Sequence, residues 1–141
     1  MKRLLLVLSL LFVALSAVLL CRWRGYFYLT QPPQVGNLVL CEALDEVNHP
    51  INTGSEFKWG TRSVCLLFDY KAFQKDTTLY VRWQYKGHTL AEEQVILTDE
   101  SGFCAFYLMK EDGAPLPIGD YSVAVESMGH VLSKAFFVVT R

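Results

Sequence analysis

The chain has 141 residues, of which 52% are hydrophobic and 19% are charged, and its formal net charge is −1. This length accommodates one domain of ordinary size together with a short targeting segment. The near-neutral charge contains no long run of one sign, which excludes the basic surface that nucleic-acid-binding proteins use. We therefore expect no nucleic-acid partner.

The N-terminal region is dominated by an apolar run at residues 4–20, broken only by Ser9 and Ser16. A helix of this length is about the shortest that can span the hydrocarbon core of a membrane. Residues 1–24 are therefore predicted to be a membrane anchor or a signal peptide. The single-pass anchor is preferred because no small-residue cleavage site closes the run. Cleavage and secretion are the alternative.

Two further features of this region concern processing and orientation. Cys21 follows the run and suggests lipidation, but the residue before it is Leu20, whereas a lipidated cysteine normally follows a small residue. The basic residues before the run favour a domain outside the cytoplasm, and those after it oppose that orientation. Residues 25–36 are predicted to be a linker, which two prolines make extended and stiff.

The remainder of the chain shows apolar and polar residues that alternate with a period of two, which is typical of half-buried strands. The expected strands are residues 37–44, 64–70, 79–85, 89–97, 103–109, 120–126 and 131–139. Residues 45–54 are expected to be a turn-rich crossing, and residues 110–118 a long loop. The fold class is thus predicted to be all-β, with an immunoglobulin-like sandwich of about seven strands over residues 37–141, preceded by one hydrophobic helix.

Four segments of this region suggest relatives by their order and spacing. They are Trp83–His88, Ser101–Phe106, Leu116–Val123 and Ala135–Val139. Together they resemble the immunoglobulin-like accessory domains of bacterial secreted and membrane proteins. This resemblance implies an adaptor or presenting module and carries no catalytic residues.

A structural role is expected for five residues of these segments. Leu116 and Tyr121 have the spacing of a tyrosine corner, in which the phenol holds the chain that enters a late strand. Gly119 supplies the conformational freedom that the corner needs. The five structural residues are Trp83, Phe106, Gly119, Tyr121 and Phe137.

Beyond Cys21, the cysteines are three in number, and none forms a C-x-x-C pair of the kind found in zinc and thiol-redox sites. Buried free thiols are the preferred interpretation of Cys41, Cys65 and Cys104. The alternative is one bridge, with Cys41 and Cys65 as the best pair, because an oxidising exterior would permit it.

Residue types that could support chemistry are scattered over turns. The histidines are His49, His88 and His130, and the acidic pairs are Asp45-Glu46, Asp99-Glu100 and Glu111-Asp112. None follows the spacing of a calcium loop, a hydrolase nucleophile elbow or a phosphate-binding loop. We therefore expect no catalytic residue, no bound cofactor and no metal site.

Exposed aromatic side chains are the remaining candidates for ligand contact, because their faces stack on sugar rings. Phe57, Trp59 and Tyr80 are the predicted ligand-facing residues. The first functional hypothesis is a non-enzymatic, membrane-anchored module outside the cytoplasm that presents an interaction surface to a protein or glycan. A carbohydrate or cell-wall binding module is the second, and a small hydrolase or metal enzyme is the third.

Overall fold

The computed structural model describes residues 9, 11–20, 22 and 31–141, and the chain divides into two units, Met1–Pro32 and Pro33–Arg141. In the first unit, the described residues from 9 to 22 are helical. None of the described helical stretches is both long and apolar enough to cross a membrane. The predicted anchor at residues 1–24 and the predicted linker at residues 25–36 lie partly outside the described residues.

The second unit is mostly β and contains eleven strands within residues 31–141. They are β1 (Gln34–Val35), β2 (Val39–Cys41), β3 (Ala43–Leu44), β4 (Pro50–Ile51), β5 (Glu56–Lys58), β6 (Ser63–Lys71), β7 (Thr78–Tyr85), β8 (His88–Ile96), β9 (Gly102–Met109), β10 (Gly119–Ser127) and β11 (His130–Thr140). The six long strands, β6 to β11, match six of the expected segments to within two residues at each end.

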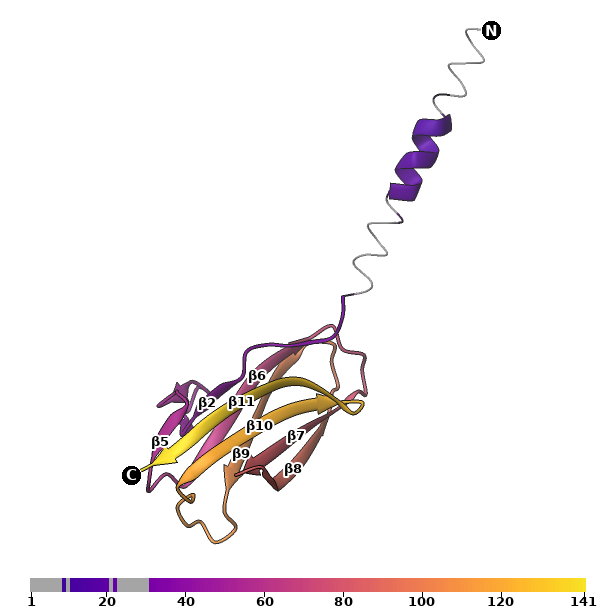
Figure 1. Ribbon diagram of the computed structural model, residues 1–141. Coiled ribbons are helices and arrows are strands. Elements are labelled where there is room, and N and C mark those ends of the chain that lie inside the picture. The colour runs from indigo at the N-terminus through magenta and orange to yellow at the C-terminus, as the bar shows by residue number, and fades with distance from the viewer. Residues whose placement is uncertain (1–8, 10, 21, 23–30) are drawn as a thin grey trace, which may run out of the picture. The chain divides into compact units, whose positions relative to one another are not determined.

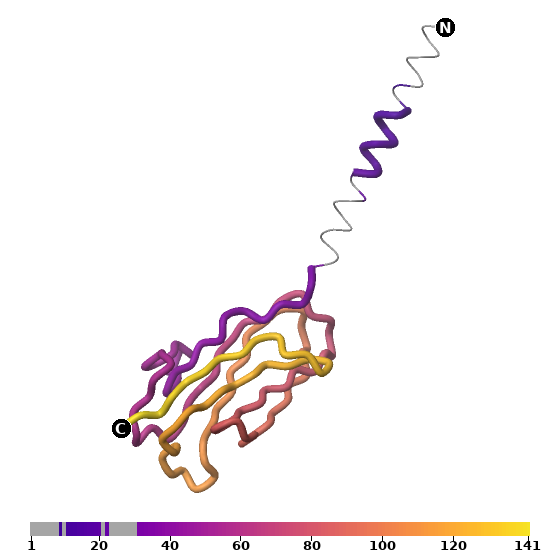
Figure 2. Tube along the Cα trace, in the orientation of Figure 1, coloured from indigo at the N-terminus to yellow at the C-terminus, as the bar shows by residue number. Residues whose placement is uncertain are grey.

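The strands form two large sheets and one small ribbon (Figures 1 and 2). One large sheet has the order β5-β11-β10-β7-β8. In the other, β6 is central, with β1 and β2 on one side and β9 on the opposite side. β3 and β4 form the ribbon, and the only parallel pair among the described strands is β5 with β11.

The segment before β6 differs from the expectation of one strand followed by a crossing. The strand expected at residues 37–44 is broken into β2 and β3, and β4 and β5 lie within residues 45–58. Asp45 explains the ribbon, because its carboxylate accepts hydrogen bonds from the backbone N–H groups of Val47 and His49 and closes a tight turn. β1 lies inside the predicted linker and pairs with the end of β6.

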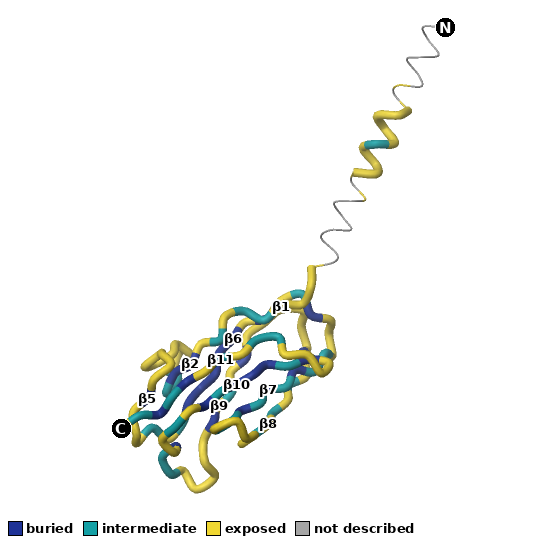
Figure 3. The backbone as a smooth tube through the Cα atoms, in the orientation of Figure 1, coloured by how far each residue is buried: buried dark blue, intermediate teal, exposed yellow. Residues whose placement is uncertain are grey.

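The core lies between the two large sheets, and both contribute to it (Figure 3). Trp83 of β7 is completely buried and packs edge-on against Phe137 of β11. Phe106 of β9 is half-buried and stacks on Phe68 of β6. Burial of these large rings is a main source of stability for a β domain of this size.

A second, smaller cluster covers the outer face of β6. It consists of Cys41, Cys65 and Leu67, with Leu44 of the ribbon packed against it. As a result β6 is buried on both faces from Val64 to Phe68, which accounts for its continuous run of apolar residues.

The corner before β10 is held by one buried hydroxyl. Tyr121 donates a hydrogen bond to the carbonyl of Pro117 at 2.6 Å, and its ring stacks on Phe137 with centroids 4.7 Å apart. Gly119 has φ +144°, and a Cβ atom there would lie 2.9 Å from the Tyr85 ring. The chain can therefore pass close to Tyr85 only because residue 119 has no side chain.

Substitution of Tyr121 should separate ring packing from hydrogen bonding. We expect Tyr121→Ala to lower the free energy of unfolding by about 3 kcal/mol or more, as for other buried aromatic truncations. Tyr121→Phe keeps the ring and should cost only about 1 kcal/mol, the usual contribution of a buried hydroxyl hydrogen bond. Denaturant titration measures both values. Equal losses in the two variants would contradict the packing role.

The same residue predicts a pH dependence. Burial, together with the nearby Tyr85, raises the pKa of Tyr121 from 10.0 to about 12. The unfolded chain therefore loses this proton at a lower pH than the folded chain. As a result, the free energy of unfolding has its full value below pH 10 and decreases as the pH rises from 10 to about 12. Thermal unfolding across this range should show a shallower decrease in Tyr121→Phe than in the wild type.

Candidate functional site

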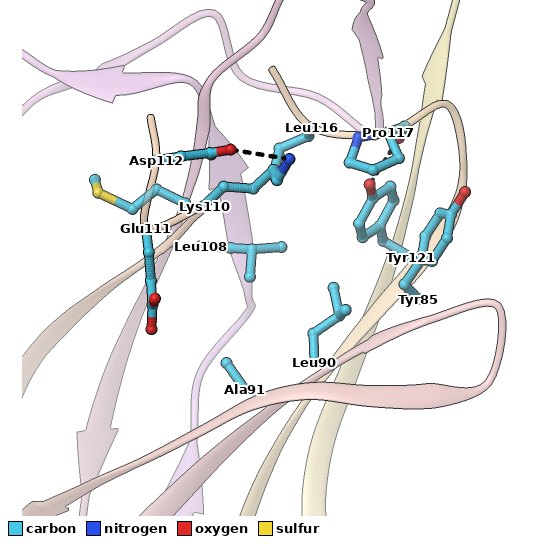
Figure 4. Close-up of a pocket in the computed structure, with 11 residues that line it drawn as sticks. Tyr85, Leu90, Ala91, Leu108, Lys110, Glu111, Asp112, Leu116, Pro117 and Tyr121 are labelled. Carbon is cyan, nitrogen blue, oxygen red and sulfur yellow. Dashed lines mark hydrogen bonds and ion pairs between the residues drawn. The ribbon is translucent and has the colours of Figure 1, made fainter. Parts of the chain in front are cut away.

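A concave groove with a volume of about 480 Å³ lies between the strands β8 and β9 (Figure 4). This volume lies within the range of ordinary ligand pockets. The lining residues are Tyr85, Leu90, Ala91, Leu108, Met109, Lys110, Glu111, Asp112, Leu116, Pro117 and Tyr121. They come from β7, β8, β9, β10 and the loop between β9 and β10.

The inner part of the groove is apolar and rigidly placed. Leu108, Leu116 and Tyr121 are buried side chains that belong to the main core. Leu116 is fixed by its backbone N–H, which donates to the carbonyl of Thr61 at 2.8 Å. The core thus extends to the bottom of the groove.

The mouth of the groove is formed by two exposed apolar side chains, Leu90 and Met109. Leu90 is the extra residue of a β-bulge, because Gln84 pairs with Thr89 whereas Trp83 pairs with Ala91. A bulge turns its side chain out of the regular alternation of the strand. The sequence signal for this mouth is Leu90, an apolar residue next to the regularly alternating positions of β8, and it was not among the predicted ligand-facing residues.

The rim of the groove carries charge. Lys110 and Asp112 form an ion pair at 3.6 Å, with both side chains exposed. The backbone N–H of Ala114 donates to the Asp112 carboxylate, and this bond, with help from Lys110, holds the pKa of Asp112 below its usual value. The loop is also tied to the domain by Arg62, whose guanidinium donates to the carbonyl of Gly113. This arrangement can accept an apolar group at its centre and polar groups at its edge.

The three predicted ligand-facing aromatics do not form one platform. Phe57 is 1% exposed and packs against Phe137, so the expectation that it faces a ligand is wrong. It fills the core because β5 pairs with β11 and directs its central side chain inward. Trp59 is 63% exposed, and Tyr80 is half-buried.

Strand register places Trp59 and Tyr80 far apart. Trp59 follows the pairing of Lys58 with Thr140, at the C-terminal end of β11. Tyr80 pairs with Glu126, next to the turn that begins β11. The two aromatics therefore lie at opposite ends of the sheet, with β10 and β11 between their strands.

Trp59 nevertheless borders a second, shallower hollow of about 440 Å³. The hollow is lined by Glu42, Lys58, Trp59, Gly60, Thr61, Arg62 and Ser63. Within it, the Thr61 hydroxyl donates to the Glu42 carboxylate at 2.9 Å. An exposed indole beside fixed polar groups is a surface on which a sugar ring can stack and form hydrogen bonds.

The three histidines are separated by the fold. His88 begins β8 at the end of the sheet where Lys86 contacts Asp120, and His130 lies at the opposite end of β10. His49 lies in the ribbon and contacts Asp45 at 3.5 Å. Within residues 9, 11–20, 22 and 31–141, no three histidine, cysteine or acidic side chains gather closely enough to hold a metal ion.

Cys41 and Cys65 lie directly opposite each other on β2 and β6, and both are completely buried free thiols. Burial is the main reason that the pKa of each thiol is raised, and the pKa of Cys65 reaches about 12 because of burial and the neighbouring Cys41. Cys104 is also a buried free thiol with a raised pKa, but it lies in the main core.

Comparisons with known proteins give structural similarity only. No protein-family model and no curated protein matches the chain. Among solved structures, it is similar to an immunoglobulin-like protein from Pseudomonas aeruginosa, with 15% identity, a TM-score of 0.48 and coverage of 78% of this chain and 93% of that one.

Two enzymes contain regions of similar structure. One is an alkylpurine DNA glycosylase from Pseudomonas fluorescens bound to DNA with an abasic site analogue, with 14% identity, a TM-score of 0.49 and coverage of 77% of this chain and 30% of that one. The other is a β-glucosidase from Listeria innocua, with 14% identity, a TM-score of 0.46 and coverage of 79% of this chain and 17% of that one. The chain spans only a minor part of either enzyme.

The two interpretations of Cys41 and Cys65 predict different chemical reactivity. The thiolate form of cysteine attacks alkylating reagents, so the burial and raised pKa values predict that neither thiol of reduced, folded protein reacts with iodoacetamide at about pH 8. Both should react once the protein is unfolded in guanidinium chloride, as peptide mass spectrometry can show. Reaction in the folded state would contradict the burial of this pair.

Cys104 provides the internal control for a bridge. If exported protein contains a bond between Cys41 and Cys65, these two residues remain unmodified in guanidinium chloride until a reductant is added. Cys104 reacts under the same conditions without a reductant.

Proposed function

We propose that the chain is a non-enzymatic binding module with an immunoglobulin-like sandwich, held at a membrane and presented outside the cytoplasm. The groove between β8 and β9 is its interaction surface. The observation that carries this proposal is the chemistry of the groove, which combines a buried apolar floor, an exposed apolar mouth and a charged rim. Protein interfaces commonly have an apolar centre surrounded by polar groups.

A protein partner is favoured over a small polar ligand at this groove. Leu90 and Met109 expose apolar surface on both sides of the opening. An inserted apolar side chain would remove both from water, as in the well-packed anchor pockets of protein interfaces. Lys110, Glu111 and Asp112 would then contact polar groups around that anchor and set its orientation.

The groove can be tested by crosslinking in cells that express the full chain. A photo-crosslinking amino acid at Leu90 should capture a partner, whereas the same amino acid at Phe136, which is exposed on β11 of the same sheet with β10 and β7 between the two strands, should not. Met109→Glu should reduce capture at position 90 because a carboxylate replaces an apolar side of the mouth. Equal capture at positions 90 and 136 would contradict a specific groove.

The membrane location rests on the apolar run and its flanking residues in the sequence, and it needs its own test. Carbonate extraction should leave the full chain in the membrane pellet. Protease added to intact cells, after removal of any cell wall, should digest residues 31–141. Release of a shortened protein into the medium would show a cleaved signal peptide, and protection from protease would show the opposite orientation.

A carbohydrate or cell-wall binding module is the second candidate, and the exposed Trp59 beside its polar hollow favours it. Trp59→Ala should then abolish binding to isolated cell-wall polysaccharide. Phe136→Ala is a matched control, because Phe136 is 64% exposed and Trp59 is 63% exposed. Binding that survives Trp59→Ala, or that is lost in both variants, would contradict this candidate.

A further inference from the structure

Each of the two large sheets ends in a strand with a free edge on the same side of the domain. In residues 31–141, β8 pairs only with β7, and β9 pairs only with β6 (Figure 1). The unpaired N–H and C=O groups of an edge strand can accept a strand from another chain. Proteins that must stay monomeric usually protect such edges.

The edge at β8 carries two protective features. The bulge at Leu90 interrupts the regular ladder. Glu93 lies on the inner side of the strand, between Ala91 and Val95, which both pack against the core. A bulge and an inward-pointing charge are two common ways in which sheets prevent further pairing.

The edge at β9 has neither feature. Its eight residues, from Gly102 to Met109, include no charged residue and no proline. β9 pairs with β6 in one continuous register, without a bulge. It is therefore a long, regular and uncharged edge, and the contrast with β8 indicates that its exposure has a function.

The register shows which backbone groups of β9 are unpaired. In β6, the carbonyl of Asp69 accepts a hydrogen bond from Gly36, on the side of β1 and β2. Successive residues of an antiparallel strand direct their backbone groups to opposite sides. Cys65 and Leu67 therefore bond toward β2, and the residues between them bond toward β9.

The free groups on β9 follow by the same alternation. Leu66 is opposite Phe106 and exchanges hydrogen bonds with it, so the neighbours of Phe106 direct their N–H and C=O groups to the free edge. The free-edge residues are Phe103, Ala105, Tyr107 and Met109. The side chains of Phe103, Ala105 and Tyr107 point to the outer face, where Phe103 is 57% and Tyr107 40% exposed, and Met109, at the end of the strand, is 60% exposed and also lines the groove.

We propose that β9 pairs antiparallel with β9 of a second copy of this chain, in a register centred on Ala105, so that the protein is a homodimer. In this register Phe103 of each copy lies opposite Tyr107 of the other. Aromatic cross-strand pairs of this kind stabilise antiparallel sheets. The two copies would then share one continuous sheet.

Charge favours a second copy as the occupant of this edge. Within the ladder no two charged side chains face each other, because β9 contains none. Just beyond each end of β9, this register brings Lys110 of one copy toward the acidic bend at Asp99 and Glu100 of the other, so opposite charges approach each other. The chain turns directly after Lys110, where the N–H of Gly113 donates to the Lys110 carbonyl, so Glu111 lies beyond the ladder. A net charge of −1 adds little repulsion between copies.

The experiment measures the mass of the full chain in mild detergent by sedimentation or by chromatography with light scattering. The wild type should be a dimer. Phe103→Glu and Tyr107→Lys should each raise the dissociation constant by about tenfold or more, because each places a charge against an aromatic ring at both symmetric positions. The double variant Phe103→Glu/Tyr107→Lys should restore the dimer, since opposite charges then face each other.

A control on the opposite sheet distinguishes loss of the β9 contact from a general effect of replacing an exposed apolar side chain. Phe136→Glu changes an exposed aromatic of β11 and should leave the dimer intact. Circular dichroism of every variant should retain the β signal, and rescue in the double variant cannot arise from misfolding. A monomeric wild type, a dimer that survives both single variants, a double variant that stays monomeric, or dissociation by Phe136→Glu would each overturn the proposal.

Discussion

The structure depends most on the way in which the chain enters β10. This strand lies between β7 and β11, so its position sets the register of both neighbours. Tyr121 secures that position from the inside, with its hydroxyl on the Pro117 carbonyl and its ring between Tyr85 and Phe137. The loop that reaches this corner also supplies Leu116 and Pro117 to the groove, so the same contacts shape the candidate site.

The two large sheets differ in the chemistry of their outer faces. On the five-stranded sheet, Arg82 forms ion pairs with Glu92 and Glu126 at 3.2 and 3.3 Å, and Phe136 is an exposed aromatic of the same sheet. On the other sheet, the ribbon covers Cys41 and Cys65, and the exposed aromatics of β9 continue the apolar surface. The apolar outer surface of the second sheet therefore extends to its edge at β9.

Much of the fold could be predicted from the sequence, because six long strands have regular alternation and clear turn residues between them. The corner at Gly119 and Tyr121 could also be predicted, since it depends on local sequence spacing. The segment before β6 was not, because strands of two or three residues carry too short a pattern and are formed by tertiary pairing. Phe57 illustrates this limit: its burial follows from the pairing of β5 with β11, which no local pattern encodes. The groove depends likewise on a bulge and on contacts between distant strands.

The passage of the chain from β2 to β5 has a mechanical consequence. β2 belongs to the sheet of β6, whereas β5 pairs with β11 of the other sheet, so residues 39–58 join the two layers along one side of the domain. Along the opposite side, β8 and β9 belong to different layers and share no backbone ladder. Two chain connections also tie this side: residues 97–101 join β8 to β9, and residues 110–118, which supply the rim of the groove, join β9 to β10. The layers are thus joined through short strands on one side and through loops on the side of the groove, so the length and contacts of these loops limit how far the groove can open.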